Sequence, residues 1–129
     1  MTGCVQSVLR PSVANDAIRV LTDQGVEVVV PPGQGCCGAL ARHAGDHDYG
    51  TALAAAHAAS FPADVDAVIA TAAGCGSSMK DTHTSGAPVL DVCEYLDRLG
   101  LMTPLALPAP LRAAYQDACH LAHAQQITA

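Results

Sequence analysis

The stretch Val26-Glu27-Val28-Val29-Val30 is followed by Pro31-Pro32-Gly33 and then by Gly35-Cys36-Cys37-Gly38, and this order predicts the fold. A run of β-branched residues is typical of a buried strand, and the prolines end it. The cysteine pair then lies in a loop at the carboxyl end of the strand, where open α/β sheets place their sites. Both thiols reach one centre only through a tight turn, which the glycines at 35 and 38 permit.

Other cysteines follow the same arrangement. Cys4 comes directly after Gly3, and the apolar run 65–70 predicts a strand that leads into Gly74-Cys75-Gly76, with its two glycines again supporting a turn. Parallel strands share a carboxyl edge, so thiols that are distant in the sequence are expected to meet there. The candidate metal ligands are Cys4, Cys36, Cys37 and Cys75.

The rest of the chain alternates between helix and strand patterns. Helices are predicted over 11–24, 39–43, 49–60 (capped by Asp46 or Asp48) and 91–99, and a short one from Ser77 or Ser78 through residue 80. A short extended piece is predicted at 89–90 and a strand over 111–117. Alternation of this kind predicts an α/β fold, a Rossmann-like open parallel sheet with helices on both faces.

Three segments are expected. Residues 1–100 form a first cysteine-rich unit, residues 101–110 hold three prolines and form a linker, and residues 111–129 begin a second unit.

Composition excludes several partners. The net charge is −6 and no basic cluster occurs, so nucleic acid is not expected as a partner. No apolar run reaches the ~18–20 residues that a membrane span needs, and no secretory signal opens the chain. The cysteines are therefore expected to be cytoplasmic thiols, available for metal or redox chemistry.

Sulfur donors at one rim suit an iron–sulfur cluster or zinc. The alternatives for Cys36-Cys37 are ordinary buried thiols or a redox pair, although a disulfide between neighbours is strained. The spacing Gly33-x-Gly35-x-x-Gly38 fits a dinucleotide fingerprint, but no helix opens at the right point.

Several cysteines and histidines are expected to lie outside the metal site. Cys93 is predicted to be a core thiol, and Cys119 is either a second-site ligand or a free thiol. The histidines at 43, 47 and 57 are predicted to be solvated surface residues.

Together these motifs resemble the cysteine-rich CCG domain. The resemblance is carried by Thr2-Gly3-Cys4-Val5-Gln6, Pro31-Pro32-Gly33-Gln34-Gly35-Cys36-Cys37-Gly38-Ala39-Leu40, Ala72-Ala73-Gly74-Cys75-Gly76 and Asp117-Ala118-Cys119-His120-Leu121-Ala122-His123-Ala124-Gln125. This domain occurs in heterodisulfide reductase, in lactate-utilisation proteins and in the iron–sulfur subunit of glycolate oxidase, whose motifs the chain resembles in particular.

The resemblance implies an electron-transfer subunit, not the substrate-oxidising chain itself. A cluster of the 4Fe-4S type would be held by Cys4, Cys36, Cys37 and Cys75, and electrons would come from a flavin-containing oxidase subunit that oxidises glycolate or another 2-hydroxy acid. Any membrane association would be peripheral, through the complex. The alternative is a zinc-binding or metal-free docking module of a related complex.

Three departures from the family pattern stand out. The ferredoxin-like module is absent, the second repeat stops soon after Cys119, and Ser78 stands where the fuller pattern ends in a second cysteine. The first strand is also reduced to Met1-Thr2. The sequence is therefore interpreted as a fragment, one repeat and the start of the next, that is expected to dimerise or to be poorly soluble.

Overall fold

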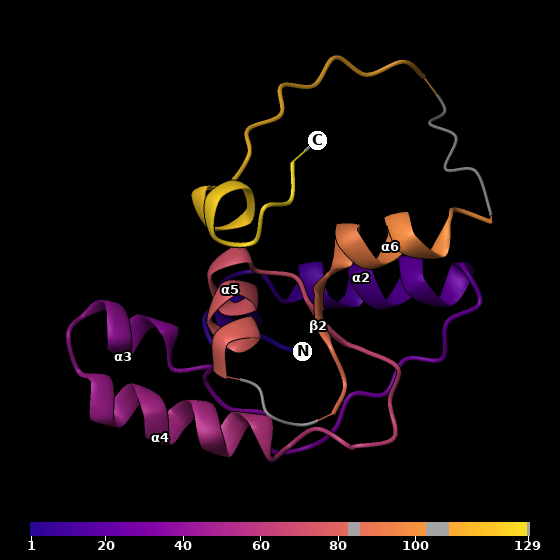
Figure 1. Ribbon diagram of the computed structural model, residues 1–129. Coiled ribbons are helices and arrows are strands. Elements are labelled where there is room, and N and C mark those ends of the chain that lie inside the picture. Colours follow the sequence, from indigo (N-terminus) through magenta and orange to yellow (C-terminus); the bar gives the residue numbers. More distant parts are fainter. Residues whose placement is uncertain (83–85, 103–108, 129) are drawn as a thin grey trace.

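The computed structural model describes residues 1–82, 86–102 and 109–128. Within these ranges the helices and strands are, in chain order, α1 (Gln6–Leu9), α2 (Pro11–Asp23), α3 (Ala39–His43), α4 (His47–Ala58), β1 (Val68–Ala70), α5 (Ala73–Thr82), β2 (Val89–Asp91), α6 (Val92–Leu99) and the π-helix η1 (His120–Ala124) (Figure 1). Helix therefore far outweighs strand in the described part of the chain.

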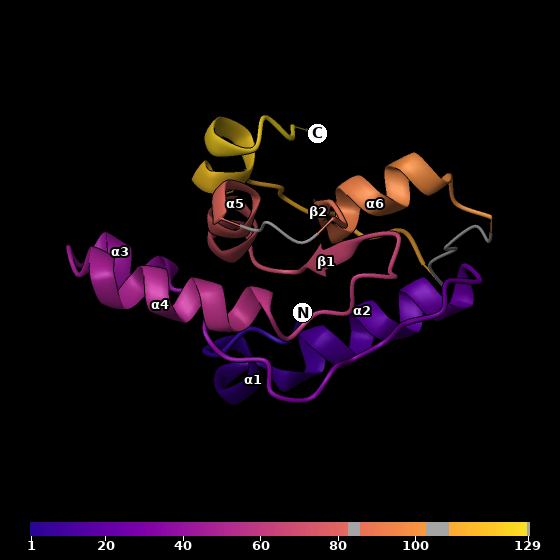
Figure 2. The ribbon, with the colours of Figure 1, turned by 60° about the horizontal axis from the view of Figure 1, so that its bottom comes forward.

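The strands β1 and β2 form a parallel pair, in which Val68 lies opposite Val89. The Val68 N–H donates to the Pro88 carbonyl at 2.9 Å, which fixes this register. Figure 2 shows the pair between α5, α6 and η1 on one side and α1, α2 and α4 on the other. The architecture is a mixed helical fold with a small parallel sheet, which is compatible with the predicted α/β class.

The hydrophobic core gathers around these strands. Its buried members are Cys37, Ala39, Val68, Ala70, Met79, Ala87 and Val89, and Met1, Phe61, Val65 and Cys75 pack against them. Cysteines 37 and 75 therefore belong both to the core and to the predicted metal site, so the site is anchored in the best-packed part of the molecule.

Most predicted helices are confirmed. Pro11 stands at the first turn of α2, and Gly25, with φ of 82°, follows its end. The short helix at 39–43 is α3. The Tyr49 N–H donates to the Asp46 carboxylate at 3.1 Å, so Asp46 is the cap of α4, which begins at His47.

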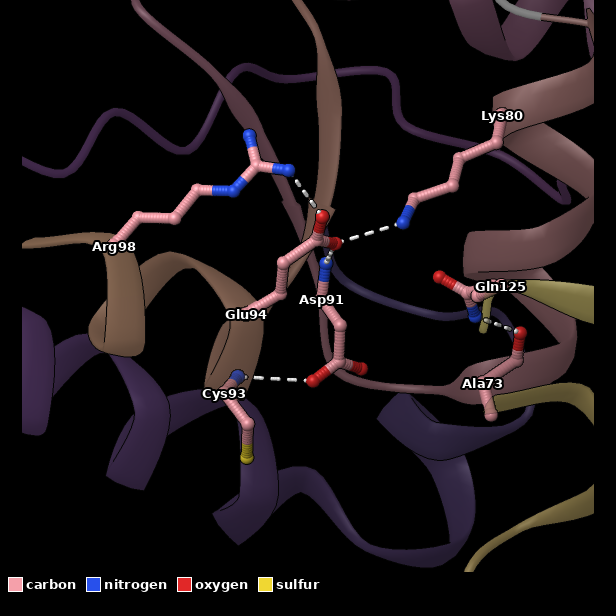
Figure 3. A network of polar contacts seen from close by, with 7 residues as sticks. All are labelled: Ala73, Lys80, Asp91, Cys93, Glu94, Arg98 and Gln125. Carbon is pink, nitrogen blue, oxygen red and sulfur yellow. Dashed lines mark hydrogen bonds and ion pairs between the residues drawn. The ribbon is translucent and has the colours of Figure 1, made fainter. Parts of the chain in front are cut away.

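Helix α6 begins with a capping box. The Cys93 N–H donates to the Asp91 carboxylate at 2.9 Å, and the Asp91 N–H donates to the Glu94 carboxylate at 3.3 Å. Figure 3 shows Lys80 of α5 and Arg98 of α6 reaching the same carboxylate, at 2.7 and 2.6 Å. Glu94 thus ties the start of α6 to α5.

Two predicted strands are wrong. The stretch 26–30 follows α2 without strand or helix, and the stretch 111–117 also has neither. A β-branched sequence becomes a strand only where another strand offers backbone groups for a ladder, and the described structure pairs neither segment with a neighbour. The predicted strand 65–70 is shorter, since β1 covers only residues 68–70.

Other predictions need correction. Helix α5 begins at Ala73, ahead of the predicted caps Ser77 and Ser78, because the chain turns into a helix directly after β1. His57 is 2% exposed and packs edge-to-face against Phe61, so it is not a surface histidine. Cys93 is exposed instead of buried, since it lies in the first turn of α6.

One observed helix had no predicted counterpart, and one predicted segment cannot be compared with the structure. Helix α1 was not predicted from the sequence, and most of the proposed linker, residues 103–108, lies outside the described residues. Among the described helices, none is both long and apolar enough to cross a bilayer.

Candidate metal centre

Three separate segments bring the candidate ligands into the same region. Cys4 lies just before α1, Cys36 and Cys37 lie just before α3, and Cys75 lies in the first turn of α5, directly after β1. Cys37 is 3% exposed, and the other three thiols are partly buried. Helix α5 packs on α3, on α4 and on both strands, which brings Cys75 next to the cysteine pair.

Cys37 and Cys75 form a hydrogen-bonded thiol pair. The hydrogen bond from Cys75 lowers the pKa of the Cys37 thiol to about 6, against the opposing effect of burial, and the Ala39 N–H and the Arg42 guanidinium also favour the thiolate. The same hydrogen bond, together with burial, raises the pKa of Cys75 far above its ordinary value. The lowered pKa of Cys37 and the raised pKa of Cys75 therefore describe one pair of thiols that shares a proton.

Cys36 and Cys4 form a second pair. Burial raises the pKa of Cys36, the Gly38 N–H that donates to its sulfur at 3.4 Å lowers it, and the hydrogen bond and charge of Cys4 raise it again. The charges of Cys4 and Cys36 also reach Cys75. The charges of the other three thiols, Cys4, Cys36 and Cys37, thus all act on Cys75.

The four thiols are not already arranged as the ligands of one metal ion. Among residues 1–82, 86–102 and 109–128, no group of three or more His, Cys, Asp or Glu side chains is arranged to hold a metal ion. Cys37 and Cys75 share a proton, whereas metal ligation requires thiols to lose their protons. The donor chemistry fits a thiolate-bound metal centre, but binding would have to draw the two pairs together.

Ser78 and Arg42 support the cysteine loop. The Ser78 hydroxyl, in a side chain that is 5% exposed, donates to the Cys37 carbonyl at 3.4 Å and accepts a hydrogen bond from the Arg42 guanidinium. Arg42 also donates to the Ser78 carbonyl at 3.5 Å. Ser78 therefore links α5 to the cysteine loop. A lone arginine in an alanine-rich helix carries no motif, so Arg42 could not be found from the sequence.

The four flanking glycines differ in importance. Gly38 has φ of 78°, and a Cβ there would collide with the Gly50 carbonyl of α4, so this position requires glycine. A Cβ on Gly35 or Gly74 would meet no atom within 4 Å, and neither has a positive φ. At Gly76 a Cβ would lie 3.1 Å from the Gln125 side chain, which packs there from the chain after η1. Only the turn at Gly38 thus depends on glycine's freedom to adopt a left-handed conformation.

Cys119 is exposed just before η1. The next residue, His120, stacks edge-to-face with His43 at 5.2 Å between ring centroids. This contact borders a cleft of about 450 Å³ that also includes Arg42 and Ser78. Cys119 therefore starts a segment that docks beside the cysteine loop, through η1 against α5.

Comparison with known proteins gives the same answer as the motifs. The Cysteine-rich domain family, CCG, matches residues 1–80, more than half of the chain. Residues 1–80 include all four thiols of the two pairs.

Curated relatives cover nearly all of this chain. An uncharacterized iron–sulfur protein of Methanocaldococcus jannaschii is 37% identical over 98% of the chain, and a subunit of fumarate reductase (CoM/CoB) from Methanothermobacter marburgensis is 35% identical over 98%. A probable glycolate oxidase iron–sulfur subunit of Bacillus subtilis is 34% identical over 93%. The chain spans only 26%, 26% and 31% of these relatives, respectively.

No solved structure matches the chain significantly. The family model covers residues 1–80, and the relatives cover nearly the whole chain. The chain therefore belongs to the CCG cysteine-rich domain family.

Proposed function

We propose that this chain is an iron–sulfur electron-transfer domain of a complex that oxidises a 2-hydroxy acid such as glycolate. Its cluster, of the 4Fe-4S type, is held by Cys4, Cys36, Cys37 and Cys75, and Cys119 serves a second site. A flavin-containing oxidase subunit is the partner that supplies electrons, and the complex works in the cytoplasm.

The observation that carries this proposal is the thiol pairing. Cys37 shares a hydrogen bond with Cys75 across 37 residues of intervening chain, and Cys36 shares one with Cys4. Soft metal centres need several thiolates in one place, and the pairing brings thiols from three separate segments together. Relatives named iron–sulfur proteins or iron–sulfur subunits support the same chemistry.

The fold that belongs with this function is a Rossmann-like open parallel sheet with helices on both faces, of which β1 and β2 are the described part. In such a sheet Cys75 and the cysteine loop lie at one carboxyl edge. The first unit, residues 1–100, then carries the site, and residues 111–129 begin a second unit.

The residues of this chain prepare the site before any metal binds. A bound cluster would supply the ability to accept and release single electrons. The lowered pKa of Cys37 favours its thiolate, which is the form of cysteine that binds a metal. Arg42 favours negative charge on Cys37 and, through Ser78, holds the loop in place.

Anaerobic reconstitution with iron and sulfide tests the proposal. We expect brown protein that contains iron and sulfide in equal amounts, as a cluster requires. Cys37→Ser and Cys75→Ser should lose most of the bound iron, whereas Cys93→Ser, at an exposed thiol outside both pairs, should keep it. Colourless protein without iron, or equal iron in all three variants, would contradict the proposal.

A second candidate is a docking module that binds zinc or no metal. Its metal-free form is favoured by the finding that no three potential ligands in the described residues are arranged around one point. Metal analysis of anaerobically purified protein separates the two functions. Zinc without sulfide, or no metal together with capture of the oxidase subunit, would favour the docking module.

A further inference from the structure

The cleft of about 450 Å³ beside the cysteine loop lies where α3, the start of α4, α5 and η1 meet. Helix α5 packs on α3 and on η1, so segments that are far apart in the sequence form its walls (Figure 2). The residues that line the cleft include none of the described cysteines. The cleft is therefore separate from the two thiol pairs.

The polar lining of this cleft consists mainly of hydrogen-bond donors. A guanidinium and a hydroxyl donate, and each imidazole carries at least one N–H. Asp81, which is exposed, is the acidic side chain among the lining residues. The donors belong to Arg42, His43, His47, Ser77 and His120. Such a lining favours a ligand that brings acceptor oxygens.

Some of these donors have no partner in the protein. Arg42 is partly buried, and both of its hydrogen bonds within the described residues start from Nη2 and end on Ser78, although a guanidinium has five N–H groups. Its guanidinium forms no ion pair with a carboxylate in the part of the chain that the structure describes. The buried Nδ1 of His120 also lacks a hydrogen-bond partner there. A ligand that pairs with these groups removes the cost of leaving them unpaired.

The charges around the cleft favour a ligand with a single negative charge. A guanidinium repels a metal cation, and no three potential ligands in residues 1–82, 86–102 and 109–128 are arranged to hold one. The planar fork of Arg42 matches a carboxylate. The Arg42 charge also acts on Cys37, and Asp81 lies on the cleft, so a second negative charge on the ligand would be poorly compensated.

We propose that this cleft binds a small organic acid, whose carboxylate pairs with Arg42. A water molecule takes up about 30 Å³ in the liquid, so a cleft of about 450 Å³ has room for further polar atoms beyond the carboxylate. Those atoms accept hydrogen bonds from His43, His47, Ser77 and His120. The inference does not depend on the proposed metal centre.

A nuclear magnetic resonance titration of the metal-free, reduced chain tests the proposal. The probe is glycolate, and the matched control is glycolamide, which has nearly the same shape but no charge. Sodium chloride keeps the ionic strength constant, because salt screens the Arg42 charge. We expect glycolate to shift the ring C–H signals of His43, His47 and His120 saturably and glycolamide to leave them in place. His57, which does not line the cleft, should not shift with either compound.

Two pairs of variants examine the charges. Arg42→Gln should weaken glycolate binding at least about tenfold, because it removes a charge-assisted pair, whereas Arg19→Gln on the exposed side of α2 should not. Asp81→Asn should tighten binding about two- to fivefold, since it removes a repelling charge, whereas Asp97→Asn on α6 should not. The Asp81 pair keeps the test open if Arg42→Gln fails to fold.

Three results would overturn the proposal. The first is an equal response to glycolate and glycolamide, which would show that the carboxylate is not recognised. The second is phosphate that binds as tightly as glycolate, which would make the cleft an unselective cationic surface. The third is binding that neither Arg42→Gln nor Asp81→Asn changes.

Discussion

Gly38 is the residue at which backbone geometry limits the site most strongly. Gly38→Ala forces an alanine to a φ of 78° and drives its Cβ into the Gly50 carbonyl. We expect a loss of about 2–4 kcal/mol in the free energy of unfolding, the sum of left-handed strain and displacement of α4. Urea unfolding followed by circular dichroism measures it.

Gly35→Ala provides the matched control on the other side of the cysteine pair. A Cβ there meets nothing within 4 Å. The free energy of unfolding should change by less than about 0.5 kcal/mol. Equal losses in the two variants would mean that the turn does not depend on Gly38 in particular.

The shared proton of Cys37 and Cys75 makes stability depend on pH. The pKa of Cys37 falls from 9.0 to about 6 on folding, so between these values the unfolded chain binds more protons than the native one. The stability of the metal-free, reduced protein should therefore rise as pH rises from 6 to 9 and be lost as pH falls through 6. Cys75, with its pKa raised, acts in the opposite direction only above pH 9.

Cys75→Ala removes the donor, so the pKa of Cys37 should move back toward its ordinary value. Urea unfolding at several pH values should then give a flatter dependence than in the parent chain. The Met1 amine, whose pKa is also lowered, is present in both proteins and cancels from the comparison. An unchanged slope would show that Cys75 does not stabilise the Cys37 thiolate.

At the scale of elements, Glu94 joins α5, β2 and α6. Burial alone would raise its pKa, but Lys80, the Asp91 N–H and Arg98 together lower it, so the carboxylate is ionised and held by three donors. Glu94→Ala should cost about 1–3 kcal/mol, because it removes the capping box and the tie to Lys80. Chemical denaturation measures the difference.

The exposed Asp16–Arg19 pair is the control for Glu94. Its atoms are 3.4 Å apart and its side chains are 65% and 79% exposed. Asp16→Ala should change stability by less than about 0.5 kcal/mol, since solvent screens such pairs. An equal loss of unfolding free energy in Asp16→Ala and Glu94→Ala would show that the capping box contributes no more than an exposed ion pair.

Helices whose ends are marked by nearby residues could be predicted from the sequence. Strands that need a distant strand to pair with could not. Pro11, Gly25 and Asp46 mark helix ends through interactions within a few residues, and α2, α3, α4 and α6 follow them closely. The predicted strands 26–30 and 111–117 had the right composition but needed a distant neighbour, which the described structure does not provide. Helix α5 starts early because the chain turns directly out of β1.

At the scale of the whole molecule, residues 109–118 lead to η1 without helix or strand until Cys119. Arg112 is exposed in this stretch, whereas Arg19 and Arg98 lie in helices. Limited trypsin digestion should cut first after Arg112, because proteases need an extended, accessible backbone. Mass spectrometry of the early products identifies the cut.

Arg112→Gln should remove this fast cleavage and leave slower cuts. Arg10 is not a competing site, since Pro11 follows it and trypsin does not cut before proline. Early cleavage inside α2 or α6 would show instead that the helices open more readily than the connecting stretch.

The residues that carry chemistry and the ends of most helices can be read from the amino-acid order, because both depend on residues that are close together along the chain. The cysteine motifs were enough to identify the family. Three-dimensional packing was needed to show that the thiols pair as Cys37 with Cys75 and Cys36 with Cys4. It was also needed to show that Arg42 and Ser78 brace the loop and that the stretch 26–30 lines a slot. Those features depend on contacts between segments tens of residues apart, and packing alone brings such segments together.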